Sequence, residues 1–564
     1  MPWHSFLSLE SPHPYGVLPA GNRFLLSNAD DASSEAAAIT NKDNSALRQK
    51  LCDETWLTVL GFLDGPSLAQ VVQSCRFFYV AGHQPELWRD LVLSQLKQNK
   101  AVLDRAETSW KDTFVMLSSS DNNKFIKSKP MKIPEIYSDY LYRLHSCRSF
   151  AIPLAWLKKS DPNCKTHRKN GVPRVLVQDM TCDKFVTQYE RANQPVVIAE
   201  AAKTWKAFRD WQDPMYLRKH TSGRTLRATS GMAPLPVNFT MAAFQQYCQS
   251  TTLEEGPLYL FDRAALNPGS HLHQDFYQDL QRTCPYFDPN RTIDSKDDDL
   301  IGHDLFQVLG EGKRPDHTWA IIGGTRSGSV FHIDPNATHA WNAAMVGRKR
   351  WLFYPPGVTP PGVYPSSDGE SVALPLSVGE WILTFWREHQ HQKATAPPSR
   401  RPLEVTAFPG DVVFVPHGWW HMVINLDKIN IAVTHNYVSR SNLGSVLRFL
   451  ECKEEQISGC RDRAESIKPN KLHATFAAAL QEEFGKDAEW LVSAREESES
   501  RWTCKAWNND DVRTKRNDPL LKKRRLNATP GEDERNELGN SVMLKAKTNN
   551  DASSGGAPFS FSFL

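Results

Sequence analysis

The sequence predicts a mainly β fold with flanking helices, in which many short strands close into a sandwich or jelly roll. The first observation is a series of β-branched and aromatic runs that begins near residue 185 and is punctuated by Gly, Pro, Asn and Asp. The second is that helical periodicity is concentrated before and after this series. Short strands of this kind pack most readily in two facing layers. The predicted strands are "QPVVIAEA", "PLYLFD", "TWAIIGG", "SVFHID", "HAWNAAMVG", "RWLFYPP", "GDVVFVP", "HMVINL" and "INIAVTHNYV".

The composition indicates a soluble protein with more than one folded unit. A chain of 564 residues is too long for a single core, and its 17 Trp indicate at least one large aromatic-rich core. With 67 basic and 64 acidic side chains, the net charge of +3 excludes a nucleic-acid-binding coat over the whole surface. No apolar run approaches about 18 residues, and Pro and His interrupt the first residues before a secretory segment forms. We therefore expect an intracellular protein without a membrane span.

Changes in composition divide the chain into six segments. Amphipathic periodicity, β-rich runs and polar low-complexity stretches mark the boundaries. In the last segment, "RTKRNDPLLKKRR" (513–525) places two basic clusters around a short spacer, which is typical of a nuclear import signal. We expect the protein in the nucleus, with a further fraction in the cytoplasm. The segments are a disordered arm (1–47), a helical module (48–97), a linker and helical region (98–174), the β-rich domain (175–440), C-terminal helices (441–504) and a disordered basic tail (505–564).

The helical module 48–97 repeats apolar residues at helical spacing. "LDGPS" and "GHQPE" divide it into three short helices. It resembles the F-box, a small module that docks on the Skp adaptor of cullin ubiquitin ligases, although Cys52 follows Leu51 in place of the usual Pro, and Phe78 stands where Trp is frequent. A generic helical subdomain is the alternative. The resemblance is carried by Leu51, Leu60, Leu63, the helix 68–75, Arg76 and Leu87–Trp88.

The ten cysteines form no C-x-x-C pair, and this pattern predicts reduced thiols. His145, Cys147, Cys164 and His167 could close a tetrahedral zinc site. Because H-x-C is not a common zinc-binding spacing, we favour scattered core and surface residues.

The segment "FHIDPNATHAWN" carries a candidate metal site. Side chains at i and i+2 of a strand share a face, so His332 and Asp334 project together and Ile333 faces away. Downstream, "FPGDVVFVPHGWWHMVINL" brings His421 into another strand. Two imidazoles and one carboxylate in this pattern match the facial triad of non-haem Fe(II) oxygenases, which leaves positions open for co-substrate and O2. Three nearby histidines compete for the same role, namely His339, His417 and His435.

A second set of polar residues fits the co-substrate of such an oxygenase. 2-Oxoglutarate has a carboxylate remote from the iron, and a buried cation holds such a group through charge-assisted hydrogen bonds. Lys349 lies at the start of the strand "RWLFYPP", while Thr434 and Tyr259 supply hydroxyl groups and Asn342 lies nearer the metal end.

With these residues in place, the segment 175–440, about half of the chain, resembles the jumonji-C oxygenases. Within them it is similar to the branch of the protein once called the phosphatidylserine receptor, which is associated with lysyl hydroxylation and arginine demethylation. The resemblance implies a double-stranded β-helix, a jelly-roll barrel like that of the cupins, preceded here by the F-box. The strings that carry it are "FVTQYERANQPVV", "GPLYLFD", "RSGSVFHIDPNATHAWNAAMVGRKRW" and "FVPHGWWHMVINLD".

The resemblance also implies roles for individual residues and a reaction. The chain departs from the branch at Ser329, where threonine is usual, and by one extra residue before Thr434. Trp319 matches a position near the pocket. The implied enzyme is a dioxygenase that uses Fe(II) and 2-oxoglutarate to hydroxylate or demethylate Lys or Arg side chains of a protein such as a histone or an RNA-processing factor. The implied iron ligands are His332, Asp334 and His421, and the implied 2-oxoglutarate contacts are Tyr259, Asn342, Lys349 and Thr434.

Two other functions fit parts of the sequence. One is a ubiquitin-ligase substrate adaptor whose barrel only recognises a client while the F-box binds the Skp adaptor. The other is a cupin-type metalloenzyme unrelated to 2-oxoglutarate, against which Lys349 and Thr434 argue. We also expect the C-terminal helices to offer a homodimer interface.

Overall fold

The structure is a computed structural model that describes residues 13–19, 51–119, 131–133, 136–158, 171–233, 235–250, 254–288, 304–366, 371–460, 463–485 and 488–500. The basic tail with its import-signal pattern lies outside the described residues, as do Cys164, His167 and most of the N-terminal arm. Within the described ranges, no helix has the length and apolar character that crossing a bilayer requires.

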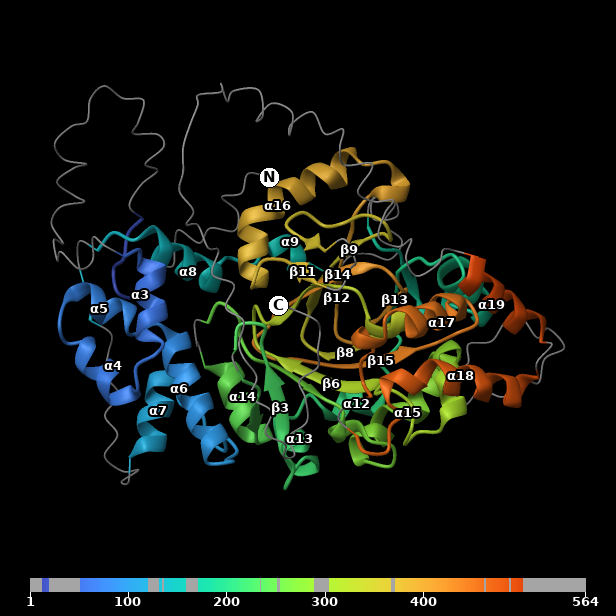
Figure 1. Cartoon of the computed structure of the whole chain (residues 1–564), viewed down its shortest axis with the longest axis horizontal. Helices are drawn as coiled ribbons and strands as arrows, with labels where there is room; N and C mark the ends of the chain where they lie inside the picture. The colour runs from blue at the N-terminus through green and yellow to red at the C-terminus, as the bar shows by residue number, and fades with distance from the viewer. Residues whose placement is uncertain are drawn as a thin grey trace, which may run out of the picture.

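A jelly roll of two facing sheets forms the centre of the molecule (Figure 1). The larger sheet has the order β1-β2-β13-β8-β15-β6-β5-β3-β4 and the smaller has the order β12-β9-β14-β7. Apart from the parallel pair β1–β2, neighbouring strands in both sheets run antiparallel. The mainly β prediction is therefore confirmed. The strands are β1 (Arg174–Leu176), β2 (Val196–Ala199), β3 (Leu226–Thr229), β4 (Val237–Phe239), β5 (Tyr259–Asp262), β6 (Thr318–Gly323), β7 (Gly328–His332), β8 (His339–Val346), β9 (Lys349–Tyr354), β12 (Leu403–Ala407), β13 (Val412–Val415), β14 (Trp420–Asn425) and β15 (Asn430–Tyr437), with the small pair β10 (Tyr364–Pro365) and β11 (Val372–Ala373) apart.

Strand β9 shows how the sequence fills both faces of the smaller sheet. Trp351 and Phe353 face the larger sheet and pack with its residues, whereas Leu352 and Tyr354 face the other way. Helix α16 (Val378–Thr395) covers that outer face through Trp381 and its neighbours. The strand is buried on both faces, so it reads as a continuous apolar run rather than an alternating one.

All nine strands predicted from the sequence are present, but several others were missed. β1, β3 and β4 are three or four residues long and carry Arg or Asn, so no apolar run marks them. β12 was missed because Glu404 interrupts it. This carboxylate is buried because it accepts hydrogen bonds from His389, Gln390 and Lys393 of α16 and pairs with Arg350.

The N-terminal module contains four short helices where the sequence predicted three. Residues 72–75 interrupt the predicted middle helix, and the Cys75 sulfur accepts from the backbone N–H of Phe78 as the next helix begins. The module shares one hydrophobic core with the larger sheet, and its Arg89 forms a buried ion pair, 3.3 Å long, with Glu254 in the segment before β5. Its helices are α3 (Asp53–Leu60), α4 (Gly65–Val71), α5 (Arg76–Ala81) and α6 (Pro85–Gln98), followed by α7 (Trp110–Ser118).

Further helices surround the sheets. The segments "CDKFVTQYE" and "TMAAFQQYC" are helical, the first as α11 continued by the π-helical turn η4 (Val186–Glu190), the second as α14. The C-terminal helices pack with residues 305–309 in one core, and the segment "HATFAAALQEEFGKDAEWLVSA" forms two helices, α18 and α19, which Gly485 separates. The remaining helices are α8 (Asp139–Ser149), α9 (Leu154–Leu157), α11 (Cys182–Phe185), α12 (Lys206–Asp210), α13 (Pro214–His220), α14 (Met241–Gln249), α15 (His271–Thr283), α17 (Leu443–Cys452), α18 (Pro469–Phe484) and α19 (Glu489–Ser500).

Candidate functional site

His332, Asp334 and His421 come together at one end of the cavity between the two sheets. One ligand atom from each lies within 4.8 Å of the others. The pairing of β7 with β14 places His332 directly opposite His421, and their ring centroids are 4.1 Å apart. Asp334 follows the end of β7, and its Oδ1 lies 3.9 Å from Nε2 of His421. The structure thus brings together the three residues that the sequence singled out.

Backbone carbonyl groups orient both imidazoles. Nδ1 of His332 lies 2.8 Å from the carbonyl oxygen of Val330, and Nδ1 of His421 lies 3.1 Å from that of Trp419. Since a carbonyl only accepts, each Nδ1 carries the proton and each Nε2 has the lone pair that a metal requires. This is the usual way in which a protein fixes the tautomer of a ligating histidine.

A rigid loop places Asp334 beside the two histidines. The chain leaves β7 after His332 and enters the short turn η8 (Pro335–Ala337), in which Asn336 adopts a left-handed φ of 56°. The Asn336 side chain donates to the carbonyl of Ser458 and accepts from its N–H, both at 3.0 Å. These two hydrogen bonds to the C-terminal region stabilise a backbone conformation that is unfavourable for most residues.

The electrostatics of this cluster suit a divalent cation. Burial lowers the pKa values of His332 and His421 to about 4, so both rings are neutral near pH 7. Burial also raises the pKa of Asp334 to about 6, an effect opposed by His332 and by a hydrogen bond from Asn436. Oδ2 of Asp334 is buried and accepts no hydrogen bond from the described residues. Two neutral imidazoles and an under-satisfied carboxylate form a donor set that a metal ion would complete.

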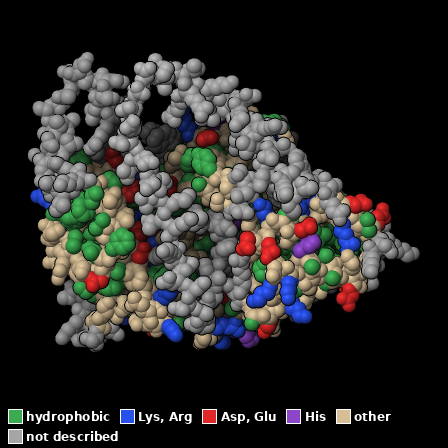
Figure 2. Space-filling view, viewed as in Figure 1, with side chains coloured by type: hydrophobic (Ala, Val, Ile, Leu, Met, Phe, Trp, Pro, Cys, Tyr) green, Lys and Arg blue, Asp and Glu red, His purple; other side chains and the backbone are tan. Residues whose placement is uncertain are grey.

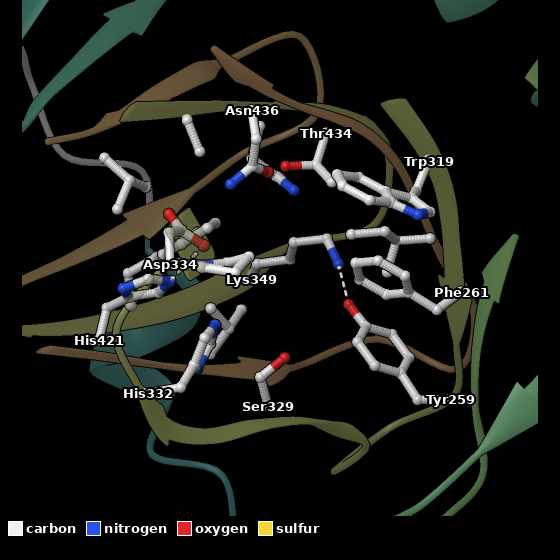
Figure 3. Close-up of a pocket in the computed structure, with 17 residues that line it drawn as sticks. Tyr259, Phe261, Trp319, Ser329, His332, Asp334, Lys349, His421, Thr434 and Asn436 are labelled. Atoms are coloured by element: carbon white, nitrogen blue, oxygen red, sulfur yellow. Dashed lines mark hydrogen bonds and ion pairs between the residues drawn. The ribbon is translucent and has the colours of Figure 1, made fainter. Parts of the chain in front are cut away.

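Lys349 occupies the other end of the same cavity (Figure 3). Its side chain is fully buried, and its ammonium donates to the hydroxyl oxygen of Tyr259 at 3.0 Å and to Oδ1 of Asn425 at 2.9 Å. Burial lowers the pKa of Lys349 to about 7. A buried cation without an acidic partner in these hydrogen bonds is a ready site for an anion.

Asn342, Thr434 and Trp319 form a row across the larger sheet on the cavity side. Thr434 of β15 lies directly between Asn342 of β8 and Trp319 of β6 in the strand register. The Thr434 hydroxyl donates to the carbonyl of Trp341 at 2.9 Å, so its oxygen is the part that can accept from a ligand. Oδ1 of Asn342 is buried and has no hydrogen-bond donor among the described residues. All seven candidate residues, and Ser329 with them, line this one cavity.

The three competing histidines have other contacts. His339 begins β8, where Nε2 lies 3.0 Å from the Ser441 hydroxyl and Nδ1 accepts the backbone N–H of His417. His417 itself is half-buried and packs edge-on against the His339 ring. His435 contacts Thr318 and the Asp304 carboxylate.

Asn425 and Asn436 were not among the residues predicted from the sequence, although the sequence contains a signal for both. Asn425 lies four residues beyond His421 on β14, and Asn436 lies two residues beyond Thr434 on β15, so both share a face with a candidate residue. Asn436 lines the cavity and donates to Thr338 at 2.9 Å. The even spacing from His421 and Thr434 could have identified them.

Comparison with known proteins agrees with this geometry. Residues 182–442 match the model of the cupin-like domain family. Arginine-specific demethylase JMJ22 of Arabidopsis thaliana is 35% identical over 500 residues, which cover 86% of this chain and 86% of the relative. The bifunctional arginine demethylase and lysyl-hydroxylase psr-1 of Caenorhabditis elegans is 30% identical over 277 residues, 49% of this chain and 63% of the relative.

A shorter match is to a relative whose name states both the metal and the co-substrate. The 2-oxoglutarate and iron-dependent oxygenase JMJD4 of Homo sapiens is 34% identical over 151 residues, 26% of this chain and 34% of the relative. The resemblance drawn from the sequence is therefore confirmed for the β-rich domain, whereas none of these matches tests the F-box. The chain belongs to the jumonji-C proteins of the cupin-like family.

Proposed function

We propose that the protein is an Fe(II)- and 2-oxoglutarate-dependent oxygenase that hydroxylates or demethylates Arg or Lys side chains of a protein substrate. The observation that carries this proposal is one cavity with two imidazoles and a carboxylate at one end and a buried lysine at the other. The names of the relatives above support it, because they state iron and 2-oxoglutarate dependence, arginine demethylation and lysyl hydroxylation.

His332, Asp334 and His421 would hold the iron. Their charge sums to minus one at neutral pH, which leaves Fe(II) with a net positive charge for an anionic co-substrate. When bound, iron with 2-oxoglutarate and O2 supplies the oxidising equivalent that inserts oxygen into a C–H bond. The rings of Trp351 and Phe353, each 6.0 Å from the His421 ring, would limit the access of bulk water to the metal.

Lys349 and Tyr259 would bind the remote carboxylate of 2-oxoglutarate. Two N–H groups of Lys349 are directed at Tyr259 and Asn425, and the third remains for a ligand. Because the Tyr259 oxygen accepts from Lys349, its own hydrogen is available to the same carboxylate. Asn342, whose buried Oδ1 has no donor among the described residues, and Thr434 would contact the co-substrate between the two ends.

Mass spectrometry of peptides incubated with the protein, Fe(II) and 2-oxoglutarate tests the proposal and separates its two reactions. Hydroxylation adds one oxygen atom to a Lys or Arg peptide, whereas hydroxylation of an N-methyl group releases formaldehyde and removes one methyl group. A peptide mixture that contains Lys, Arg and methylated Arg should yield one of these products. Unmodified peptides together with an absence of succinate would contradict the proposal.

The affinity for 2-oxoglutarate should depend on pH through Lys349. The ammonium form binds the carboxylate, and the pKa of Lys349 in the free protein is lowered to about 7 by burial. A bound carboxylate raises that pKa, so affinity is constant below about pH 7 and weakens up to about tenfold per pH unit above it. Calorimetric titration of the metal-loaded protein from about pH 6 to pH 9 measures this. A dissociation constant that stays flat over this range would show that Lys349 does not carry the charge.

The N-terminal module favours a second function, capture of the Skp adaptor of a cullin ubiquitin ligase. An apolar patch lies on and beside α3, in which Phe62 is 85% exposed, Val59 40% and Leu51 39%. Hydrophobic side chains also gather over this module in Figure 2. Leu60 is 2% exposed and belongs to the core, so it cannot contact an adaptor directly. Exposed apolar patches of this kind mark contact surfaces for other proteins.

Phe62→Asp should abolish adaptor capture without affecting oxygenase turnover, because a charge in the centre of an apolar interface is costly. A pull-down with purified Skp adaptor, with succinate formation measured in parallel, checks both. Leu154→Asp is the matched control, since Leu154 is 75% exposed on another part of the chain. Undiminished capture by folded Phe62→Asp protein would exclude this patch as the docking surface.

We further propose that residues 513–525 direct the protein to the nucleus, which their two basic clusters support. Deleting them should shift a fluorescent fusion toward the cytoplasm, and an unchanged nuclear fraction under the microscope would make them an ordinary charged run.

Homodimerisation through residues 441–504 stays a prediction. The apolar face of α17 is covered by α18 and α19 of the same chain, so that face is not available to a second copy.

A further inference from the structure

We propose that Asn425 is a positioning residue that directs the Lys349 ammonium toward the co-substrate, as part of a chain of hydrogen bonds fixed on the turn between β6 and β7. The inference rests on the proposed function, because Lys349 is the group that would meet 2-oxoglutarate. Asn425 ends β14 directly opposite Lys349 of β9 and is fully buried. It acts on the ligand through Lys349.

The direction of the hydrogen bonds fixes the orientation of the Asn425 amide. The Ser327 hydroxyl donates its single hydrogen to the carbonyl of Gly324 at 2.6 Å. Its oxygen must therefore accept from Asn425, whose Nδ2 lies 2.9 Å away. Oδ1 of Asn425 consequently faces Lys349, from which it accepts at 2.9 Å. A flipped amide would place two donors against each other at Lys349.

The backbone of Asn425 is held by the same turn. Its N–H donates to the carbonyl of Ser327 at 2.9 Å, and its carbonyl accepts from Arg326 at 2.9 Å. Both main-chain groups and both ends of the side chain are therefore paired. The amide has little freedom to turn away from Lys349.

Gly323 allows this group of side chains to converge. A Cβ atom at this position would lie 2.3 Å from Oγ of Ser327, 2.6 Å from Cδ2 of Tyr259 and 2.8 Å from Nδ2 of Asn425. No ordinary side chain fits at these distances. Gly323 therefore lies next to both Tyr259 and Asn425, the two hydrogen-bond partners of Lys349. A larger residue at this position would displace them.

A neutral amide suits this position better than an acid. In the described part of the chain, Lys349 faces the Tyr259 hydroxyl from β5, Asn425 from β14 and Ala407 from β12, while Asp334 and the two histidines lie at the far end of the cavity. The side-chain oxygen Oδ1 of Asn425 orients the Lys349 ammonium without neutralising its charge. The positive charge remains for the anionic co-substrate, whereas a carboxylate at this position would compete for it.

The test compares two substitutions of Asn425 in metal-loaded protein by calorimetric titration with 2-oxoglutarate across pH. Asn425→Ala should raise the dissociation constant about tenfold to a hundredfold at neutral pH and move the onset of weaker binding to lower pH, because the ammonium loses an acceptor. Asn425→Asp should also weaken binding, by competition, but move that onset to higher pH. Fe(II) affinity should stay at the wild-type value in both.

Opposite pH shifts distinguish positioning of Lys349 from general damage to the fold. Asn430→Ala is the matched control, since Asn430 is equally buried but bonds to the Asp427 carbonyl on a neighbouring turn, and it should leave both affinity and pH onset unchanged. Wild-type affinity and onset in the two Asn425 variants would overturn the inference. If Asn425→Ala does not fold, the near-isosteric Asn425→Asp variant is the test. In that case, weakening of 2-oxoglutarate binding that begins at the wild-type pH would overturn the inference. Failure of the wild-type protein to bind 2-oxoglutarate would instead refute the proposed function.

Discussion

Asp334→Ala is expected to eliminate stoichiometric Fe(II) binding and 2-oxoglutarate turnover together. Asp334 is the one carboxylate of the described three-residue cluster, and without it two neutral imidazoles remain. Fe(II) prefers a mixed nitrogen and oxygen donor set, and loss of an anionic ligand removes the largest favourable electrostatic contribution to binding. Iron content after gel filtration and succinate formation are the two measurements.

The same substitution should not unfold the protein. Burial already disfavours the charged carboxylate, as its raised pKa of about 6 shows, so its removal should leave thermal stability of the metal-free protein unchanged or higher. Ile333→Ala is the matched control, because Ile333 is the adjacent residue and its side chain is 37% exposed on the other side of the chain. Turnover that survives Asp334→Ala would show that another residue completes the metal site.

Lys349→Ala is expected to raise the 2-oxoglutarate requirement by roughly a hundredfold or more while leaving Fe(II) binding largely intact. Removing one partner of a buried ion pair costs roughly 3–5 kcal/mol, and each 1.4 kcal/mol corresponds to about tenfold in affinity. Lys349 lies at the opposite end of the cavity from the three candidate iron ligands. The dissociation constants for 2-oxoglutarate and Fe(II), measured separately, test the division of labour.

Two further variants sharpen this experiment. Lys349→Met keeps most of the side-chain volume and should show the same loss, which separates charge from packing. Arg348→Ala changes the preceding residue, whose guanidinium pairs with Asp427 on a partly exposed turn, and should leave the 2-oxoglutarate affinity unchanged. An unaltered affinity in both Lys349 variants would remove this lysine from the co-substrate site.

The parts of the site that the sequence predicted depend on the two-residue period of a strand. His332 and Asp334 could be placed on one side of the chain because Ile333 had to face the other, and the structure retains this even though β7 ends at His332. Lys349 could be singled out because a charged residue at the start of an apolar strand is costly to bury unless it has a partner. The roles of these residues stay predictions until the substitutions above are made.

Other features could not be read from the sequence because they depend on pairing between distant strands. Asn425 gains its significance only from lying opposite Lys349, and Glu404 can be buried in β12 only because α16 supplies its partners. The predicted middle helix of the N-terminal module is divided where Cys75 caps the start of α5, a local contact that propensity alone does not reveal.

Succinate formation by the wild-type protein tests the central claim most directly. Purified protein would be incubated with Fe(II), 2-oxoglutarate and air in the presence of peptides that carry Lys, Arg and methylated Arg, and succinate would be quantified with each component omitted in turn. We predict succinate that requires iron, 2-oxoglutarate and O2 and that accompanies modified peptide. Protein that binds Fe(II) but forms no succinate and does not bind 2-oxoglutarate would contradict the account.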